Sequence, residues 1–379
     1  MSVIKILADE NMRGLEEAFA SLGELVTAAG RDIRGADLKD VDVLLVRSVT
    51  RVDAALLEGS AVKFVGTATA GYDHVDRSYL GEHDIGFAAA PGANANAVVE
   101  YVLAAIAACD DHLERLFDGG RVGIVGAGHV GSLLARRLAS LGVEYVAYDP
   151  WLAADTVPHA AALEDVLSSQ VVTLHPELTQ REPWPSRHLL EASRLAGIKA
   201  PQLLINASRG PVIDGRALLE RLRAEDSPNC VLDVWEDEPS VNPALYQRCF
   251  LGTAHIAGYS LDAKRRATEM LATAVCAHFG REPPVTDDSS KAPDLRLGQT
   301  PEPLAGLRRL ILDAYDIGLD HQLLGQALNA AHSHQEFDLL RRDYRDRREL
   351  CGRRVLGDFT PEMAGVIHAL GCHSAQEPQ

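Results

Sequence analysis

Short apolar runs rich in Val, Ile and Leu recur along the chain, separated by stretches with helical spacing. Three runs lie at residues 3–8, 41–46 and 62–67, with a helical pattern at 13–21. After a long stretch of apolar and small residues at 95–108, further runs follow at 121–125, 143–149, 171–174, 203–206 and 230–234. Such runs are typical of buried strands, and strands that alternate with helices form parallel sheets. The pattern predicts an α/β protein in which a smaller doubly wound unit precedes a larger, Rossmann-like one.

The pattern changes at residues 282–303, where Pro, Ser and acidic residues dominate. This composition is typical of a linker, with room for one short strand. Beyond it, residues 304–315 and 337–349 have helical patterns, and the second carries an arginine cluster: Arg341, Arg342, Arg345, Arg347 and Arg348. Such a cluster is usually a solvated helix face. The alternative is that part of it completes a phosphate site across a dimer interface.

Composition narrows the class of protein. The chain has 379 residues, enough for two or three domains, and a formal net charge of −17. That charge argues against partners such as nucleic acid and anionic membranes. The N-terminus lacks a signal-peptide pattern and no run of 18 apolar residues occurs, so a cytoplasmic protein is expected. The six cysteines are scattered without metal-ligand spacing, which favours free thiols and no metal.

A glycine-rich turn follows the run at 121–125. Gly126, Gly128 and Gly131 stand in Gly-x-Gly-x-x-Gly spacing, with His129 and Val130 between the last two, and a helix is predicted at 132–141. The next strand ends at Asp149. This context is typical of a dinucleotide site, because the glycines allow backbone and helix N-terminus to approach a pyrophosphate.

Asp149 is the residue that distinguishes NAD from NADP in this prediction. A carboxylate there accepts hydrogen bonds from the ribose hydroxyls and repels a 2′-phosphate, so NAD is predicted rather than NADP. The alternative is a glycine-rich turn that binds nothing.

Three polar residues follow later strands of the same unit: Arg209, Glu238 and His255. Because ligands bind at the carboxyl ends of parallel strands, all three are expected at the cofactor crevice. A histidine suits proton transfer at neutral pH, a carboxylate orients it, and an arginine holds a substrate carboxylate. Taken singly, each has a plain alternative: a surface arginine, a member of a solvated acidic turn, and a hydrogen-bonded loop histidine.

These motifs, together with residues 71–76, resemble the D-2-hydroxyacid dehydrogenase family over roughly residues 3–280. The resemblance implies Arg209, Glu238 and His255 as the catalytic set, with His255 as proton donor and acceptor. It also implies a flavodoxin-like lid domain, split in sequence. One departure is His175-Pro176-Glu177, where relatives have His-Thr-Pro. A threonine hydroxyl is absent there and Pro176 has no N–H, which removes a cofactor contact expected at this loop.

Segments 7–12, 46–50, 64–71 and 255–262 resemble one branch of the family, which also has an extra C-terminal domain. Members of that branch oxidise 4-phospho-D-erythronate to (R)-3-hydroxy-2-oxo-4-phosphooxybutanoate in pyridoxal 5'-phosphate biosynthesis, and they are homodimers. This resemblance implies substrate contacts from Ser48, Thr69 and Tyr259. It implies NAD contacts, besides those of the glycine turn, from Asp149, Ala207, Ser208, Arg209, Asp233 and Gly258. Arg47 and Arg51 flank Ser48 and are candidate phosphate ligands.

The resemblance implies three domains. A lid or substrate domain would take residues 1–93 and 259–281, an NAD-binding domain 94–258, and a small α/β dimerisation domain 286–379. Two alternatives stay open: another substrate in the family, such as 3-phosphoglycerate, and a non-catalytic NAD-sensing module. A regulatory amino-acid-binding domain at the C-terminus would show a βαββαβ rhythm, whereas the segment past residue 304 has mainly helical patterns.

Overall fold

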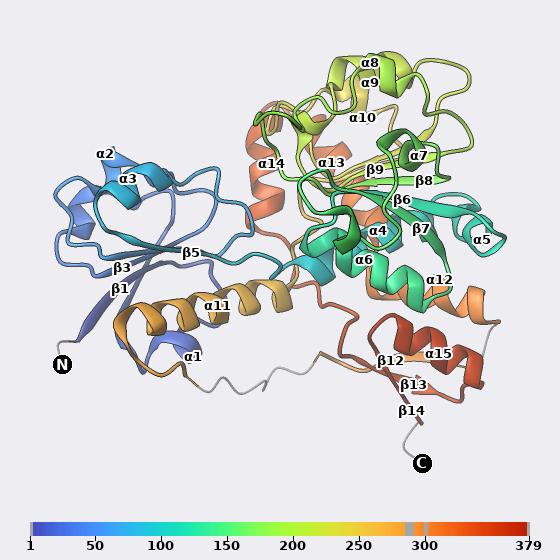
Figure 1. The fold of residues 1–379 in the computed structure, drawn as a ribbon. Helices are drawn as coiled ribbons and strands as arrows, with labels where there is room; N and C mark the ends of the chain where they lie inside the picture. The colour runs from blue at the N-terminus through green and yellow to red at the C-terminus, as the bar shows by residue number, and fades with distance from the viewer. Residues whose placement is uncertain (1–2, 285–291, 299–301, 377–379) are drawn as a thin grey trace. The chain divides into compact units, whose positions relative to one another are not determined.

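The computed structural model describes residues 3–284, 292–298 and 302–376, which form two compact units (Figure 1). Unit 1 takes Met1–Asn94 and Ser260–Lys291, and unit 2 takes Ala95–Tyr259 and Ala292–Gln379. The C-terminal segment is thus part of the second compact unit. The three functional domains stay a prediction.

Unit 1 is built on a five-stranded parallel sheet with the order β2-β1-β3-β4-β5. Its strands are β1 (Ile4–Asp9), β2 (Gly23–Ala28), β3 (Val43–Val46), β4 (Phe64–Thr67) and β5 (Gly86–Ala89). This is the flavodoxin-like order, so that prediction is confirmed. The edge strands β2 and β5 escaped prediction because neither contains a continuous buried run.

Helices cover both faces of this sheet. Ile4 and Ile6 of β1 pack with α1 (Leu15–Phe19) and the long α11 (Leu261–Phe279). Leu7 packs on the opposite side, where η1 (Gly35–Leu38), α2 (Ala54–Leu57) and α3 (Arg77–Glu82) lie. The helix α11 begins at Ser260, whose side chain accepts a hydrogen bond from the Ala263 N–H, and it ends at Gly280 in the left-handed conformation.

Unit 2 contains a six-stranded parallel sheet with the order β11-β10-β9-β8-β6-β7. Its strands are β6 (Arg121–Val125), β7 (Glu144–Tyr148), β8 (Val171–Leu174), β9 (Leu203–Asn206), β10 (Asn229–Leu232) and β11 (Leu251–Gly252). From β6 the chain first adds β7 on one side and then β8 on the other. The strand order therefore reverses at β6, which confirms the predicted Rossmann-like unit and puts its ligand crevice at the carboxyl end of β6 and β8.

Side chains alternate between the two faces of this sheet. Ile124 packs in the cluster that includes α4 (Ala95–Ala108), α5 (His112–Phe117) and α6 (His129–Ser140). Val125 packs in the opposite cluster, with α7 (Leu163–Leu167), α8 (Ala192–Leu195), α9 (Gly215–Arg221) and α10 (Pro243–Tyr246). Burying each large apolar side chain contributes about 1.5–3 kcal/mol to stability, so both faces hold the strand ends in place.

The C-terminal segment has a parallel sheet of its own, formed by β12 (Leu295–Gly298), β13 (Arg354–Gly357) and β14 (His373–Ala375). Its helices are α12 (Pro303–Ala314), α13 (Ile317–Leu328), α14 (Ser333–Arg342) and α15 (Pro361–Ala369). The predicted helix at 304–315 is confirmed, and the predicted linker holds the one short strand β12. Residues 285–291 and 299–301 of that linker, and the first residues of the predicted domain 286–379, lie outside the described residues.

The predicted helix at 337–349 was wrong in extent, since α14 ends at Arg342. The chain then runs without helix to Leu350. Tertiary contacts account for this: Arg345 donates to the buried Asp320, and Arg347 donates to the carbonyls of Ala97 and Ala257. These contacts outweigh the local helical preference.

The C-terminal helices cover the edge of the main sheet. The Gly252 N–H of the edge strand β11 donates to Nδ1 of His321 at 3.0 Å, and the Tyr246 hydroxyl donates to the His321 carbonyl at 2.8 Å. Leu324 of α13 and Phe337 of α14 are buried in the same cluster as the sheet. An open strand edge is thereby protected, and α14 is fixed beside the strand ends of unit 2.

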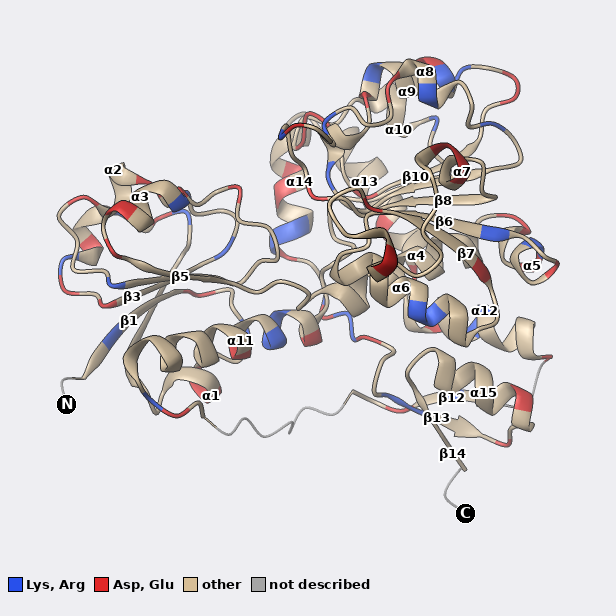
Figure 2. Ribbon diagram, in the orientation of Figure 1, with Lys and Arg blue, Asp and Glu red and all other residues tan. Residues whose placement is uncertain are grey.

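Acidic side chains outnumber basic ones, 54 to 37, and both kinds are spread over the helices and loops (Figure 2). All six cysteines are free thiols. No helix among the described residues is long and apolar enough to cross a membrane. Within the same residues, no group of three or more His, Cys, Asp and Glu side chains is arranged to hold a metal ion.

Candidate active site

The glycine turn lies at the carboxyl end of β6, where the strand order reverses. Gly126 has φ +92°, and a Cβ added there would lie 2.7 Å from the backbone of His175 and Pro176. A Cβ on Gly131 would lie 1.9 Å from the Gly126 carbonyl oxygen. At Gly128, by contrast, an added Cβ meets nothing within 4 Å. Two glycines are thus needed for packing, whereas Gly128 leaves open space beside the first turn of α6.

Asp149 follows β7 and reaches back to this turn. Its Oδ2 accepts the Ala127 N–H at 2.9 Å, and its Oδ1 accepts the Trp151 N–H at 3.0 Å. The carboxylate predicted to read the ribose is therefore held against the glycine turn.

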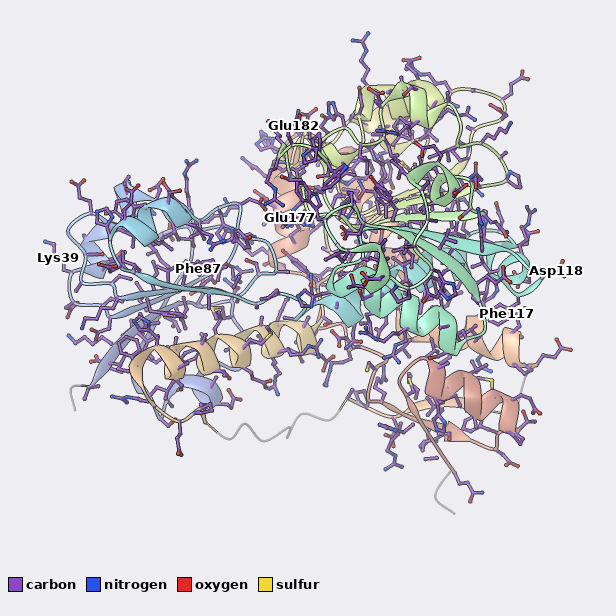
Figure 3. The ribbon with its side chains drawn as sticks, viewed as in Figure 1. Lys39, Phe87, Phe117, Asp118, Glu177 and Glu182 are labelled. Carbon is purple, nitrogen blue, oxygen red and sulfur yellow. The ribbon has the colours of Figure 1, made fainter. Side chains whose placement is uncertain are left out.

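The loop after β8 completes this part of the edge, and Figure 3 labels Glu177 and Glu182 on it. His175, the first residue of the loop, is half-buried, and the loss of hydration lowers the pKa of its imidazole to about 3. Its Nε2 lies 3.0 Å from the Thr173 hydroxyl. This histidine stays neutral and contributes packing against Gly126 rather than proton transfer.

A buried asparagine shapes the turn that carries Arg209. The Asn206 side chain accepts from the backbone N–H and the hydroxyl of Ser208, at 3.1 and 2.8 Å, and donates to the Arg209 carbonyl at 3.0 Å. The Arg209 guanidinium in turn donates to the Ser208 carbonyl at 2.8 Å. This is a side-chain-closed turn of the kind that Asn favours, and it fixes residues 207–209 at the end of β9.

A buried aspartate holds the turn that carries His255. The Asp233 carboxylate, 1% exposed, accepts from the Thr253 hydroxyl at 2.6 Å and from the N–H groups of Ile256 and Ala257 at 2.8 and 2.9 Å. Burial raises the pKa of this carboxyl. The His255 N–H donates to the Asp233 carbonyl at 2.7 Å, and His255 adopts φ +54°. Asp233 therefore fixes an unusual backbone conformation at His255.

His255 and Glu238 form a pair. Nδ1 of His255 lies 2.6 Å from Oε1 of Glu238, and both side chains are 26% exposed. The second oxygen of Glu238 accepts the Trp235 N–H at 3.3 Å. Burial by itself raises the pKa of Glu238, but the charge and hydrogen bond of His255 outweigh it, so that pKa lies below its ordinary value. An ionised carboxylate thus orients the imidazole through Nδ1, and Nε2 is the nitrogen available for proton transfer.

Neighbouring strand ends bring these turns together. A Cβ on Gly210 would lie 2.0 Å from the Trp235 carbonyl oxygen, so the turn after β9 presses against the turn after β10. The neighbouring acid Glu236 is used separately, because it accepts from His188 and from the Gly215 N–H. Glu238 is therefore not a member of a solvated acidic turn.

Two parts of the chain match known families. Residues 106–257 match the D-isomer specific 2-hydroxyacid dehydrogenase, NAD binding domain, and residues 288–371 match a domain of unknown function, DUF3410. Curated relatives extend the similarity over the whole chain. The erythronate-4-phosphate dehydrogenase of Klebsiella pneumoniae (strain 342) is 43% identical over 99% of this chain and 100% of its own length. That of Cellvibrio japonicus (strain Ueda107) is 44% identical over 93% and 94%.

The chain belongs to the erythronate-4-phosphate dehydrogenase family. Solved structures at lower sequence identity share its fold. A D-lactate dehydrogenase from Aquifex aeolicus, complexed with NAD and lactic acid, aligns with a TM-score of 0.59 at 21% identity, over 73% of this chain and 96% of that one. An NAD⁺-bound 3-phosphoglycerate dehydrogenase of Entamoeba histolytica aligns with a TM-score of 0.62 at 20% identity, over 76% and 99%.

Two residues assigned to substrate by resemblance to this family lie in unit 1. Ser48 is exposed just beyond β3, and Thr69 follows the adjacent β4, so both stand at the carboxyl edge of that sheet. The Thr69 hydroxyl lies 2.7 Å from the Thr67 hydroxyl and donates to the Gly71 carbonyl at 2.7 Å.

The flanking arginines of unit 1 already have acidic neighbours. Nε of Arg47 lies 3.1 Å from the buried Asp9 carboxylate, and the exposed Arg51 pairs with Asp53 at 2.8 Å. A phosphate would have to compete with these carboxylates for either side chain. Both arginines remain candidate phosphate ligands, but their carboxylate neighbours make this role less favourable than the sequence indicated.

The C-terminal arginine cluster of this family member is not the solvated helix face that its composition suggested. Arg342 is exposed and pairs with Asp343, whereas Arg345 pairs with the buried Asp320 and Arg347 is itself buried. The prediction failed because the helix ends at Arg342, so the later arginines follow tertiary contacts instead of helical spacing. Arg341 is partly buried near Tyr259, and Arg348 is partly buried as well.

Sequence reasoning missed the residues that hold the site in shape. Asn206 had a signal, since an Asn directly after a strand and two positions before a Ser is typical of a side-chain-closed turn. Thr253 had none, because its hydroxyl lies between Asp233 and Tyr101 (2.6 and 2.8 Å) only through contacts between residues far apart in the chain.

Proposed function

We propose that this chain oxidises 4-phospho-D-erythronate to (R)-3-hydroxy-2-oxo-4-phosphooxybutanoate, with NAD as the hydride acceptor, in pyridoxal 5'-phosphate biosynthesis. The observation that carries the reaction type is the His255–Glu238 pair at the carboxyl edge of a sheet that also bears a dinucleotide turn. The substrate is supported by 41–43% identity, over 99% of the chain, to relatives named for it.

The residues at the glycine turn fit a dinucleotide. Open space at Gly128, the N-terminus of α6 and the Asp149 carboxylate suit a pyrophosphate and a ribose. NAD, when bound, supplies the hydride acceptor. The residues proposed to hold it are Gly126, Gly128, His129, Val130, Gly131, Asp149, Ala207, Ser208, Arg209, Asp233 and Gly258. For Asp233 the buried, triply hydrogen-bonded carboxylate supports a positioning role beside any cofactor contact.

The protein side of the reaction follows from the pair. Nε2 of His255 takes the proton of the C2 hydroxyl as the C2–H bond breaks, and the Glu238 carboxylate stabilises the imidazolium so formed. Arg209, held at the end of β9, binds the substrate carboxylate in a forked geometry and stabilises the developing 2-oxo group. In the reverse direction His255 returns the proton.

The rest of the substrate site and the assembly are proposed from the family resemblance. Ser48, Thr69 and Tyr259 contact substrate, the C-terminal segment forms a homodimer, and the protein works in the cytoplasm. The C-terminal sheet supports a role other than amino-acid regulation, because its described strands are all parallel and do not follow a βαββαβ order.

Absorbance of NADH tests the proposal. The purified full chain is given NAD with 4-phospho-D-erythronate, 3-phosphoglycerate or D-lactate in parallel. We expect the highest kcat/KM on 4-phospho-D-erythronate. A higher kcat/KM on 3-phosphoglycerate would reassign the substrate within the family. If no 2-hydroxy acid yields NADH, the proposal that the chain is an enzyme is overturned in favour of an NAD-sensing module.

A further inference from the structure

One arginine of the C-terminal segment, Arg341, contacts Tyr259, a residue proposed to bind substrate, and forms no ion pair with a described carboxylate. Arg341 lies in the last turn of α14, where Figure 2 shows basic residues at one end of the helix and acidic ones towards the other. Its Nη2 donates to the Tyr259 hydroxyl at 3.3 Å, and its guanidinium carbon lies 5.8 Å from the Tyr259 ring centroid. Arg341, Tyr259 and Glu238 all belong to unit 2.

The Arg341 guanidinium makes few hydrogen bonds to the protein. Among the described residues, the bond to Tyr259 is its one hydrogen bond, and Nε is inaccessible to solvent without a partner. No carboxylate of the described chain lies within ion-pair distance of it, although Arg342 pairs with Asp343 and Arg345 with Asp320. A guanidinium has five donors, and leaving them unpaired in a partly buried place is costly. Such a side chain is suited to an anionic ligand.

The nearby carboxylates already accept hydrogen bonds from other groups. Glu238 accepts from His255 and Trp235, and Asp233 accepts from Thr253, Ile256 and Ala257. Burial lowers the pKa of Arg341, but Tyr259, Glu238 and Asp233 outweigh this and raise it, so the side chain stays charged. A positive charge thus lies close enough to Glu238 to affect its pKa, yet forms no ion pair with it.

The end of α14 is held firmly in this position. Phe337 of the same helix is fully buried, and Tyr344, just beyond it, donates to Asp320 at 2.7 Å. The Tyr344 ring also packs edge-on against Tyr259 at 6.0 Å. Arg341 is therefore preorganised for binding, which reduces the entropic cost of holding a ligand.

We propose that Arg341 binds the phosphate group of the substrate, so that the C-terminal segment supplies the specificity for a phosphorylated acid. This rests on the proposed function. The substrate has two anionic ends, and Arg209 is proposed for the carboxylate beside the reacting carbon. Arg341 takes the other end, through charge-assisted hydrogen bonds to phosphate oxygens.

The test compares Arg341→Ala with Arg342→Ala, an exposed arginine one residue along the same chain. On 4-phospho-D-erythronate we expect Arg341→Ala to lose about 10- to 100-fold in kcat/KM, as for a charge-assisted hydrogen bond, and Arg342→Ala to match the parent chain. On D-erythronate, which lacks the phosphate, the two variants and the parent should be alike. The Ki of inorganic phosphate as a competitive inhibitor should rise in Arg341→Ala alone.

Other outcomes overturn the proposal. Equal losses on both acids, with a shifted pH profile, would make Arg341 a positioning residue for Glu238. Equal behaviour of the two alanine variants would make it a surface arginine. If the parent chain does not oxidise 4-phospho-D-erythronate, the proposed function fails by itself. Calorimetric binding of inorganic phosphate to the parent and to Arg341→Ala then decides the role of Arg341, and equal affinities would refute it.

Discussion

Nδ1 of His255 lies 2.6 Å from a carboxylate oxygen of Glu238, and His255 adopts a left-handed backbone conformation with φ +54°. Asparagine tolerates that conformation, whereas alanine does not. His255→Asn therefore removes the imidazole with less strain than His255→Ala. We expect it to lower kcat by about two orders of magnitude or more, while calorimetry shows unchanged NAD affinity. A kcat near that of the parent chain would refute the role of His255.

The same pair predicts non-additive substitutions. Glu238→Gln removes the charge that orients and stabilises the imidazolium, so kcat should fall about 10-fold or more. Once His255 is absent, Glu238 has no imidazole to act on. The variant carrying both His255→Asn and Glu238→Gln should therefore be no slower than His255→Asn by itself. Additive losses measured in this cycle would mean that Glu238 acts independently of His255.

Alanine substitutions at two glycines of the same turn should have different effects. Gly131→Ala places a Cβ 1.9 Å from the Gly126 carbonyl oxygen, so it should lower the free energy of unfolding by about 1–3 kcal/mol. Gly128→Ala meets nothing within 4 Å and should leave stability unchanged, but it should weaken NAD about 10-fold because the backbone can no longer approach the pyrophosphate. Urea unfolding and NAD calorimetry on both variants check this pair. A Gly128→Ala variant that binds NAD normally would count against the turn as the cofactor site.

Asp149 carries a charge and two hydrogen bonds, and these can be separated. Asp149→Asn keeps an oxygen that accepts the Ala127 N–H but removes the negative charge that repels a 2′-phosphate. The ratio of kcat/KM with NAD to that with NADP should fall about 10-fold, equivalent to about 1.4 kcal/mol. Asp149→Ala removes the hydrogen bonds as well and should also weaken NAD. An unchanged ratio in both variants would exclude Asp149 as the ribose reader.

A buried glutamate makes stability depend on pH. Glu100 of α4 accepts the N–H groups of Leu350 and Cys351 at 2.7 and 3.1 Å, and burial, helped by repulsion from Glu349, raises its pKa to about 8. In the folded chain it therefore keeps a proton that the unfolded chain has released above its ordinary pKa of 4.5. Stability should fall as pH rises between these two values, by up to about 1.4 kcal/mol per pH unit.

Glu100→Gln keeps the acceptor oxygen and abolishes this titration. Urea unfolding should show a flatter pH dependence in Glu100→Gln than in the parent chain, with the variant the more stable at the upper end of the window. The exposed Glu225→Gln serves as the matched control and should follow the parent. Parallel curves for all three proteins would show that Glu100 does not titrate in this range.

The strands that sequence predicted are those with continuous apolar runs. Buried strands such as β6, β8 and β9 have the bounds that their Val, Ile and Leu residues indicate, since burial on both faces requires such a run. The edge strands β2 and β5 lack one, because an edge strand is partly solvated. The helix predicted across 337–349 failed for the opposite reason, since local composition favoured a helix that Asp320 and the carbonyls of Ala97 and Ala257 prevented.

By itself the sequence determined the parallel α/β architecture, the glycine turn with Asp149, and the residue types of the pair. These depend on local properties: hydrophobic period, backbone freedom and side-chain chemistry. Only the tertiary structure decided that Asp233 holds the His255 turn, that Glu236 and Glu238 have separate partners, and that Arg341 of the C-terminal segment contacts Tyr259. Such relationships join residues up to 82 positions apart, and they arise from strand order and packing, which local pattern does not encode.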